Sequence, residues 1–272
     1  MKSKHYLRAL TIAGSDSGGG AGIQADLKTF SALGCYGMSV ITALTAQNTV
    51  AVTGIMEVAP EFVAKQIDAV LDDIGADVVK IGMLSSPEII ATVSERLRAH
   101  RIRRIVLDPV MVAKSGDKLL RDEAVAALKS ELLPLATIIT PNMPEAEALN
   151  GTVVTDRTAL QQAAERLLAM GPTAVLVKGG HLADSSSDDF LLVRGSSGAD
   201  GHWLPQTRID SNNTHGTGCT LSSAIAAFLA QGEEIVAAVT QAKTYITGAI
   251  TAGADYRLGR GHGPVHHFFR QW

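Results

Sequence analysis

Two glycines and a cysteine, Gly216, Gly218 and Cys219, close a polar loop just before an Ala- and Ser-rich stretch that predicts a helix over residues 221–230. Glycines let backbone N–H groups converge, and a helix start adds unpaired N–H donors and the positive end of its dipole. With Thr217, these residues therefore indicate an anion site. The first helical turn favours a thiolate, so Cys219 could take a proton from a substrate hydroxyl. The alternative is a tight turn with a small buried cysteine.

A second glycine-rich loop spans residues 14–22 and follows a short apolar strand over residues 9–13. Its glycines match neither the P-loop nor the dinucleotide-binding fingerprint, so it is either a phosphate cradle of another kind or a flexible connection. Apolar residues at helical spacing then predict a helix over residues 22–33. Asp26 lies off the apolar stripe of that helix and faces either the loop or solvent.

Gln47 belongs to a cluster of polar side chains, residues 45–49, that ends a strand predicted over residues 38–44. Ligands of open α/β sheets bind at the carboxyl ends of strands. A side-chain amide presents a donor beside an acceptor, which is the pattern needed to bind a ring nitrogen next to an amino group. Gln47 therefore predicts recognition of a heterocycle.

Asn142 and Glu145 are three residues apart at the start of a predicted helix, after a strand over residues 136–140 that Pro141 ends. Near a nucleotide they could hold water on Mg²⁺ or face the triphosphate. Equally, they could be an N-cap and its first-turn glutamate. Lys178 ends another strand, where it is either a phosphate contact or a solvated strand end.

The remaining elements continue the alternation of strand and helix. Strands are predicted over residues 52–58, 77–84, 104–111 and 174–181, with a hairpin of 189–193 and 201–209; helices are predicted over 60–73, 87–99, 122–132, 158–170 and 233–253. This alternation predicts an α/β fold with a mostly parallel central sheet and helices on both faces. We find no linker or repeat, so residues 1–272 are expected to form a single domain.

Composition excludes several classes of function. The chain of 272 residues is 46% hydrophobic with a formal net charge of −3, and it lacks the basic patch of a nucleic-acid-binding protein. The N-terminal apolar run is too short for a signal sequence or a membrane span. With only Cys35 and Cys219 there is no disulfide framework. These features predict a cytoplasmic protein with no nucleic-acid or membrane partner.

Seven motifs, taken in order, resemble those of the bacterial hydroxymethylpyrimidine/phosphomethylpyrimidine kinases of thiamine biosynthesis, in the ribokinase-like superfamily. They cover residues 14–26, 45–49, 80–84, 108–111, 140–145, 178–181 and 215–219, and the match spans nearly the whole chain. The resemblance implies a ribokinase-like three-layer sandwich. It also implies that ATP and Mg²⁺ support phosphorylation of 4-amino-5-hydroxymethyl-2-methylpyrimidine, and then of its monophosphate to the diphosphate.

The resemblance also implies a role for each matching residue. Substrate would be bound by Gln47, which holds the aminopyrimidine, and by four residues that line the pocket, Gly14, Asp26, Met83 and Val110. The anion hole and base would be residues 216–219. ATP would contact Asn142 and Lys178, and the metal would be held by Glu145 and Asp108. Most members of the wider superfamily carry Asp where this chain has Cys219.

Two alternatives remain open. Related chains of this fold phosphorylate pyridoxine, pyridoxal or pyridoxamine, which share with the pyrimidine a hydroxymethyl group on a six-membered nitrogen ring. The chain could instead be a non-catalytic ligand-binding relative, although Cys219, Asn142, Glu145 and Lys178 are all present. A homodimer is expected by resemblance.

Overall fold

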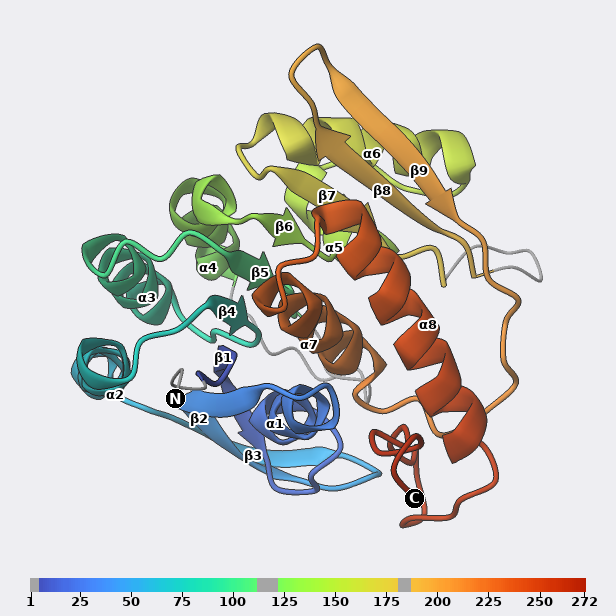
Figure 1. Cartoon of the computed structure of the whole chain (residues 1–272), viewed down its shortest axis with the longest axis horizontal. Helices are drawn as coiled ribbons and strands as arrows, with labels where there is room; N and C mark the ends of the chain where they lie inside the picture. The colour runs from blue at the N-terminus through green and yellow to red at the C-terminus, as the bar shows by residue number, and fades with distance from the viewer. Residues whose placement is uncertain (1–4, 112–121, 181–186) are drawn as a thin grey trace.

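The computed structural model describes residues 5–111, 122–180 and 187–272. The strands are β1 Arg8–Asp16, β2 Tyr36–Gln47, β3 Val52–Glu57, β4 Val78–Ile81, β5 Ile105–Leu107, β6 Ile138–Ile139, β7 Ala174–Val177, β8 Asp189–Arg194 and β9 Ala199–Leu204. Within the described ranges they form one nine-stranded sheet in the order β3-β2-β1-β4-β5-β6-β7-β8-β9 (Figure 1). β3, β8 and β9 are antiparallel to their neighbours, and the other pairings are parallel. The predicted mostly parallel sheet is confirmed.

Helices cover both faces of this sheet, as the sequence predicted. The helices are α1 Gly22–Ala32, α2 Pro60–Asp73, α3 Pro87–Ala99, α4 Asp122–Ala127 (continued by the turns Leu128–Leu132 and Leu133–Leu135), α5 Met143–Asn150, α6 Arg157–Ala169, α7 Thr217–Ala230 and α8 Ile235–Gly253. One core cluster joins one sheet face to α2 through α6, and a second joins the opposite face to α1, α7 and α8. The result is a three-layer sandwich.

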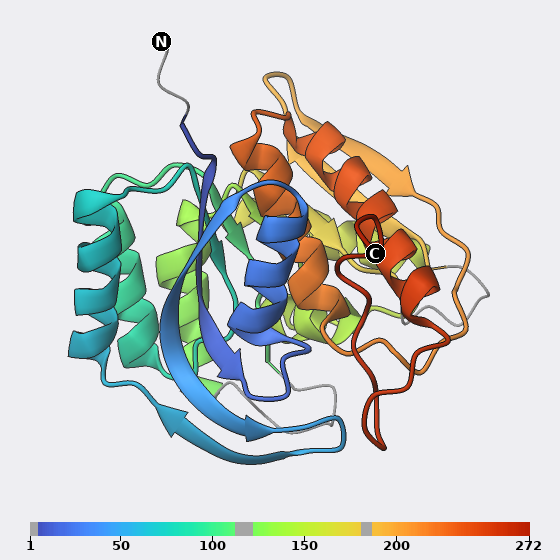
Figure 2. The same ribbon diagram turned by 60° about the horizontal axis from the view of Figure 1, so that its bottom comes forward.

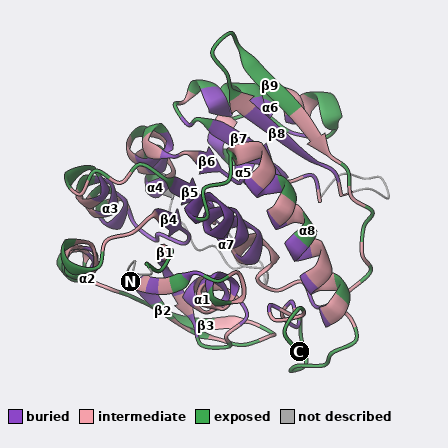
Figure 3. Ribbon diagram, viewed as in Figure 1, coloured by how far each residue is buried: buried purple, intermediate pink, exposed green. Residues whose placement is uncertain are grey.

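Helix α7 packs on the sheet with α1 and α8 as its neighbours, and Figure 3 shows it buried along most of its length. All of its residues from Thr220 to Ala230 are buried. Small side chains at Ser222, Ser223 and Ala224 allow the helix to pack close to the strands. The sheet therefore holds the first turn of α7 firmly at the carboxyl ends of β1, β4 and β5.

Several boundaries differ from those predicted. Helix α7 begins at Thr217 rather than at residue 221, because Gly216 adopts φ 78° and ends the loop there. β1 continues to Asp16 with a register shift between Ala13 and Ser15, where a loop was expected. β5 and β6 are shorter than their apolar runs, since only three and two residues pair with neighbours.

Candidate active site

The predicted substrate residues lie on both sides of the point where the strand order reverses. The chain passes from β1 to β2 on one side and later to β4 on the other, and ligands of open α/β sheets bind at such a switch. Gly14, in β1, and Met83, after β4, are brought together: a Cβ added to Gly14 would lie 3.3 Å from Sδ of Met83. Half-buried Val110 follows β5 and half-buried Gln47 ends β2. Their roles in binding stay predictions.

The predicted anion hole is the first turn of α7. Gly216 is its N-cap, and no side chain caps the N–H groups that follow. A helix start leaves these donors without intrahelical partners. Thr217 turns inward on the loop, where its N–H and its hydroxyl both donate to the Thr214 carbonyl. The N–H groups of Gly218 and Cys219 are therefore the remaining candidates for the predicted anion site.

A cluster of charged groups lies beside this helix start. Nζ of Lys178 is 3.1 Å from Oδ1 of Asp108 and 3.8 Å from Oε2 of Glu145. A Cβ on Gly218 would lie 3.5 Å from both Nζ of Lys178 and Oδ2 of Asp108. Asp108 also accepts a hydrogen bond of 3.0 Å from the Thr140 hydroxyl. Four of the predicted residues thus meet at one place.

The Asn142–Glu145 pair forms a capping box at the start of α5. Oδ1 of Asn142 accepts from the Glu145 N–H at 2.8 Å, and Oε2 of Glu145 accepts from the Asn142 N–H at 2.7 Å. The structural interpretation of these residues is confirmed. Their other predicted role, at Mg²⁺ and the triphosphate, stays a prediction. Asn142 also pairs with Lys178 in a parallel bridge, which holds the box next to the charged cluster.

The charges of the cluster shift one another's pKa values. Burial, together with the charge of Asp108, raises the pKa of Glu145 to about 7 against the opposing effect of Lys178. Burial also acts to raise the pKa of Asp108, but the charges of Lys178 and Lys80 outweigh it, and that pKa is lowered. The pKa of Lys178 is raised because its two carboxylate neighbours outweigh desolvation. Asp108 and Lys178 are therefore ionised at neutral pH.

The structure does not favour the thiolate expected at Cys219. Burial raises the pKa of the half-buried thiol to about 11, and the charges of Asp26 and Asp108 add to that effect. Lys80 and the Gly22 N–H act in the opposite direction without reversing it. The helix start alone is too weak to overcome desolvation and two carboxylates.

Asp26 lies in a buried network that the sequence did not reveal. Its two carboxylate oxygens are each 2.9 Å from Nζ of Lys80, and they accept hydrogen bonds from the hydroxyls of Thr11 and Ser223. The side chains of both Asp26 and Lys80 are 0% exposed. In this state Asp26 presents no surface to a ligand, so its pocket-lining role stays a prediction. The sequence did contain one signal for this network: Lys80 lies within an otherwise apolar central strand, and a buried lysine requires an acidic partner.

A second pair that sequence reasoning missed joins the two glycine-rich loops. Nε2 of His215 lies 2.8 Å from Oδ2 of Asp16, at the end of β1, and 3.4 Å from the carboxamide nitrogen of Gln47. The position of His215 directly before Gly216 was a signal for proximity to the anion hole. Its partner is 199 residues away in sequence, and nothing in the sequence identifies it.

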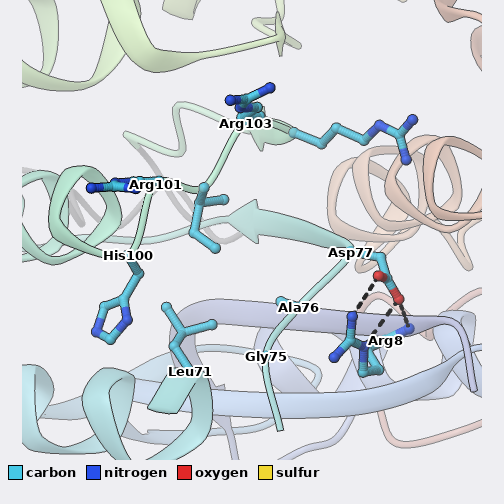
Figure 4. A pocket seen from close by; sticks show the side chains of 10 residues that line it. Arg8, Leu71, Gly75, Ala76, Asp77, His100, Arg101 and Arg103 are labelled. Carbon is cyan, nitrogen blue, oxygen red and sulfur yellow. Dashed lines mark hydrogen bonds and ion pairs between the residues drawn. The ribbon is translucent and has the colours of Figure 1, made fainter. Parts of the chain in front are cut away.

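A cavity of about 490 Å³ lies at the opposite edge of the sheet, among the amino ends of β1, β4 and β5. Figure 4 shows Arg8 joined to Asp77, while Arg101 and Arg103 lie across the cavity and point away from that pair. His100 is paired with Asp68. Because these basic side chains do not converge, the cavity is a weaker candidate for an anion site than the cluster at the carboxyl ends of the strands. His181, the last residue of the motif at 178–181, lies outside the described residues.

Comparison with known proteins identifies the family. The sequence model of phosphomethylpyrimidine kinases matches residues 16–266. The chain belongs to this family. It is 54% identical over 270 residues to the hydroxymethylpyrimidine/phosphomethylpyrimidine kinase of Rhizobium meliloti, covering 97% of this chain and 98% of that protein. It is also 55% identical to the thiamine biosynthesis bifunctional protein ThiED of Geobacter sulfurreducens, of which it spans about half the length (51%).

Solved structures of the family and of its relatives share the fold. The phosphomethylpyrimidine kinase of Clostridium difficile 630 superposes with a TM-score of 0.78 at 49% identity, covering 89% of this chain and 99% of that one. An ADP complex of Bacillus subtilis pyridoxal kinase superposes with a TM-score of 0.89 at 37% identity, covering 98% of this chain and 100% of that one. Sequence identity and backbone similarity thus favour different relatives. Backbone similarity reflects the fold that both kinases share, so sequence identity is the better guide to the substrate. Among the described residues, no helix has the length and hydropathy of a membrane span.

Proposed function

We propose that this chain phosphorylates 4-amino-5-hydroxymethyl-2-methylpyrimidine with ATP and then phosphorylates the monophosphate to the diphosphate, in thiamine biosynthesis. One observation carries the proposal. Gly218 lies in the open first turn of α7, and a Cβ added to it would be 3.5 Å from Oδ2 of Asp108 and from Nζ of Lys178. N–H donors and an ammonium group then converge on one volume, as transfer of a phosphoryl group requires. Membership of the phosphomethylpyrimidine kinase family supports the substrate.

The charged cluster fits the magnesium complex of ATP. Glu145 and Asp108 are both buried, and the charge of Asp108 acts with burial to raise the pKa of Glu145 to about 7. A divalent cation would relieve that repulsion, and carboxylate oxygens are the ligands it prefers. Asp108 and Glu145 would hold Mg²⁺, while Lys178 and Asn142 would contact the phosphates. The metal would neutralise charge on the phosphate oxygens.

The two acceptors differ in what they need from the protein. In the first step the alcohol oxygen would attack the terminal phosphorus of ATP as the bond from that phosphorus to ADP breaks, and the alcohol's proton would pass to the ionised thiol of Cys219. In the second step the attacking oxygen belongs to a phosphate monoester, whose second pKa is about 6, so it is already largely ionised. The N–H groups of Gly218 and Cys219 would stabilise the transferring group in both steps.

A pyridoxal kinase is the second candidate, because the Bacillus subtilis enzyme shares this fold, with a TM-score of 0.89 at 37% identity. Turnover of the pyrimidine and of pyridoxal, measured side by side with ATP, separates the two. We expect kcat/KM to be higher for the pyrimidine. A higher value for pyridoxal would overturn the assignment of substrate, and no acceptor-dependent ATP consumption with either alcohol would favour the non-catalytic alternative.

We also propose that the chain acts as one kinase domain, in the cytoplasm and as a homodimer. The single sheet of the described residues supports the first, and the free thiols of Cys35 and Cys219 support a reducing compartment. For the dimer, the paired residues Leu44 of β2 and Met56 of β3 lie on one face at the edge of the sheet and are 44% and 68% exposed. Apolar cross-strand pairs at an open edge favour association with a second copy.

A further inference from the structure

A segment near the C-terminus, residues 259–264, lies against the turn between β2 and β3 (Figure 2). Thr49, in that turn, accepts two hydrogen bonds from the segment. Its hydroxyl accepts from the Gly261 N–H at 3.2 Å, and its carbonyl accepts from the His262 N–H at 2.9 Å. A Cβ on Gly261 would lie 1.9 Å from the Thr49 carbonyl oxygen. This close approach of two backbones therefore requires glycine at position 261.

The same segment also lies against the loop that precedes the predicted anion hole. The His215 N–H donates to the Gly263 carbonyl at 3.0 Å, and His215 pairs with Pro264 in a parallel bridge. A Cβ on Gly263 would lie 2.0 Å from Oδ1 of Asn213, a side chain whose nitrogen donates to the Gly253 carbonyl at 2.7 Å. Asn213 is 7% exposed, so it has little room to move aside. This second contact therefore also depends on a glycine.

The residues that follow the segment anchor it in the core beside α7. Val265 is 3% exposed, and the His266 N–H donates to the Ala249 carbonyl of α8 at 3.0 Å. Nε2 of His267 lies 3.1 Å from the hydroxyl of Thr220, in the first turn of α7. Burial lowers the pKa of His267 to about 4, so the ring is uncharged at neutral pH. Residues 259–264 are thus fixed relative to the start of α7.

We propose that residues 259–264 are a positioning segment that sets the distance between Gln47 and the anion hole. Gln47 lies two residues before Thr49, and Gly216 directly follows His215, so the segment contacts close neighbours of both. The attacking oxygen must come within about 3–3.5 Å of the phosphorus, so a small displacement of the ring from the anion hole slows transfer. This inference rests on the proposed function.

The test adds a methyl group at each contact, in Gly261→Ala and in Gly263→Ala. In each variant we expect kcat/KM for the pyrimidine alcohol to fall on the order of 10²-fold, because ring and anion hole are no longer in register. The loss should be the same for the monophosphate, since both acceptors carry the ring. The Kd of ADP, measured by calorimetry, should be unchanged. A loss confined to one acceptor, or an equal weakening of ADP binding, would contradict the positioning role.

The double variant distinguishes one connection from two independent clashes. Because either substitution breaks the same connection, the double variant should lose little more than the more impaired single variant. Hydrogen exchange tests the connection without a substrate. Gly263→Ala should increase amide exchange in residues 48–51, although this substitution faces the other contact. Losses in kcat/KM that multiply, or unchanged exchange in residues 48–51, would overturn the inference.

Gly201→Ala is the control for a clash far from the site. A Cβ there would lie 2.7 Å from Cζ of Phe190, in the hairpin of β8 and β9 at the other edge of the sheet. It should lower the free energy of unfolding and leave kcat/KM unchanged for both acceptors. Equal kinetic losses in Gly201→Ala would show that reduced stability alone causes them, and would overturn the inference.

A second pair of variants keeps the test open if Gly261→Ala fails to fold, judged by its thermal unfolding. Thr49→Val removes the acceptor of the Gly261 N–H and should lower kcat/KM severalfold for both acceptors, whereas Thr49→Ser retains the hydroxyl and should match the wild type. A wild type without turnover of either acceptor would overturn the proposed function, and exchange in residues 48–51 would still test the connection. Normal wild-type turnover with unimpaired variants would overturn this inference alone.

Discussion

Cys219 shows how opposing effects combine at one residue. Lys80 and the Gly22 N–H favour its thiolate, whereas burial and two carboxylates disfavour it, and the pKa rises to about 11. At neutral pH the thiol is therefore almost entirely protonated. A base that is mostly in its acid form gives a rate that rises with pH until the pKa is reached. Phosphoryl transfer through a loose transition state also needs less help from a base than from positioning and charge.

Replacing Cys219 by Ala should affect the two phosphorylations unequally. We expect kcat/KM for the alcohol to fall on the order of 10²-fold, at the low end of what a positioned base contributes. For the monophosphate the loss should be severalfold at most, because its attacking oxygen is already ionised. Steady-state kinetics with each acceptor, supplied separately, measures the two losses.

The pH dependence of the wild type provides an independent check on Cys219. Between pH 7 and 9 the rate with the alcohol should climb as the thiolate fraction grows, and the rate with the monophosphate should stay nearly flat. Cys219→Ser retains a small polar side chain but ionises far less readily, so its alcohol profile should lose the climb. Equal losses for both acceptors, with unchanged profiles, would show that Cys219 only shapes the loop.

At the scale of single residues, local spacing indicated candidate residues but not their partners. Gly216, Cys219, Asn142 and Lys178 could be named as candidates because their spacing around helix starts and strand ends is local. The bond between Asp16 and His215 joins residues 199 positions apart, so no local pattern contains it. The ionisation of Cys219 also could not be predicted, since it depends on charges supplied by three other elements.

Two glycines at the start of α7 have different roles, one in backbone conformation and one in the proposed anion site. Gly216 has φ 78°, and a Cβ there would lie 1.8 Å from the Gly20 carbonyl oxygen. Gly216→Ala should therefore lower the free energy of unfolding by about 2–4 kcal/mol through backbone strain and a clash. A Cβ on Gly218 meets Asp108 and Lys178 at an ordinary 3.5 Å. Gly218→Ala should fold normally, yet kcat should fall on the order of 10²-fold because the methyl group occupies the anion site.

Gly232→Ala is the matched control for backbone conformation, because Gly232 has φ 93° with nothing within 4 Å of the Cβ position. It should cost about 1–2 kcal/mol and leave kcat unchanged. Denaturant unfolding and steady-state kinetics on the three variants separate the effects. A stable, fully active Gly218→Ala would remove Gly218 from the proposed anion site, and so would a loss of kcat in Gly232→Ala equal to that in Gly218→Ala.

The buried ion pair of Lys80 and Asp26 joins β4 to α1, and Ser223 connects the same carboxylate to α7. Lys80→Met leaves a buried carboxylate without its cation, and we expect a loss of about 3–5 kcal/mol in the free energy of unfolding. Lys80→Met combined with Asp26→Leu should recover much of that loss, since neither charge is then buried alone. Urea unfolding of both variants measures this.

The exposed pair of Arg98 and Glu131, whose side chains are 47% and 37% exposed, is the control for the buried one. Arg98→Met should cost at most about 1 kcal/mol, because solvent screens an exposed pair. Should Lys80→Met cost no more than Arg98→Met, the burial of the pair would not increase its contribution to stability.

Element boundaries were predicted where a local cause sets them and missed where packing does. Pro60 and Pro87 begin α2 and α3 as expected, because proline suits the first turn. Helix α7 starts early for a local reason that the prediction overlooked, the positive φ of Gly216, whereas the shortness of β6 depends on which backbone groups find partners across the sheet. Those partners come from distant segments, so the apolar runs alone overestimate the strands.

For the whole molecule, the alternation of strands and helices predicted the layers, but it did not give the strand order. The order places β1 in the interior of the sheet, with β2 on one side and β4 on the other (Figure 1). The predicted substrate residues gather there because both neighbours end at the same edge. Figure 2 shows the turn between β2 and β3 beside the C-terminal segment, and the His262 N–H donates to the Thr49 carbonyl at 2.9 Å. That contact could not be predicted from the sequence.

The exposed edge formed by β2 and β3 leads to a prediction about assembly. Leu44 and Met56 are opposite each other on one face, and Ile55, Val50 and Phe62 are exposed nearby in sequence. If two copies bury this edge, Met56→Glu places like charges at the interface and should shift a dimer toward monomer. Val153→Glu, at a residue 71% exposed elsewhere, should leave the mass unchanged. Sedimentation equilibrium measures all three proteins. A monomeric wild type would contradict the dimer, and a Met56→Glu protein that stays dimeric would place the interface on another surface, because a stable interface of ordinary size does not tolerate unpaired charges at its centre.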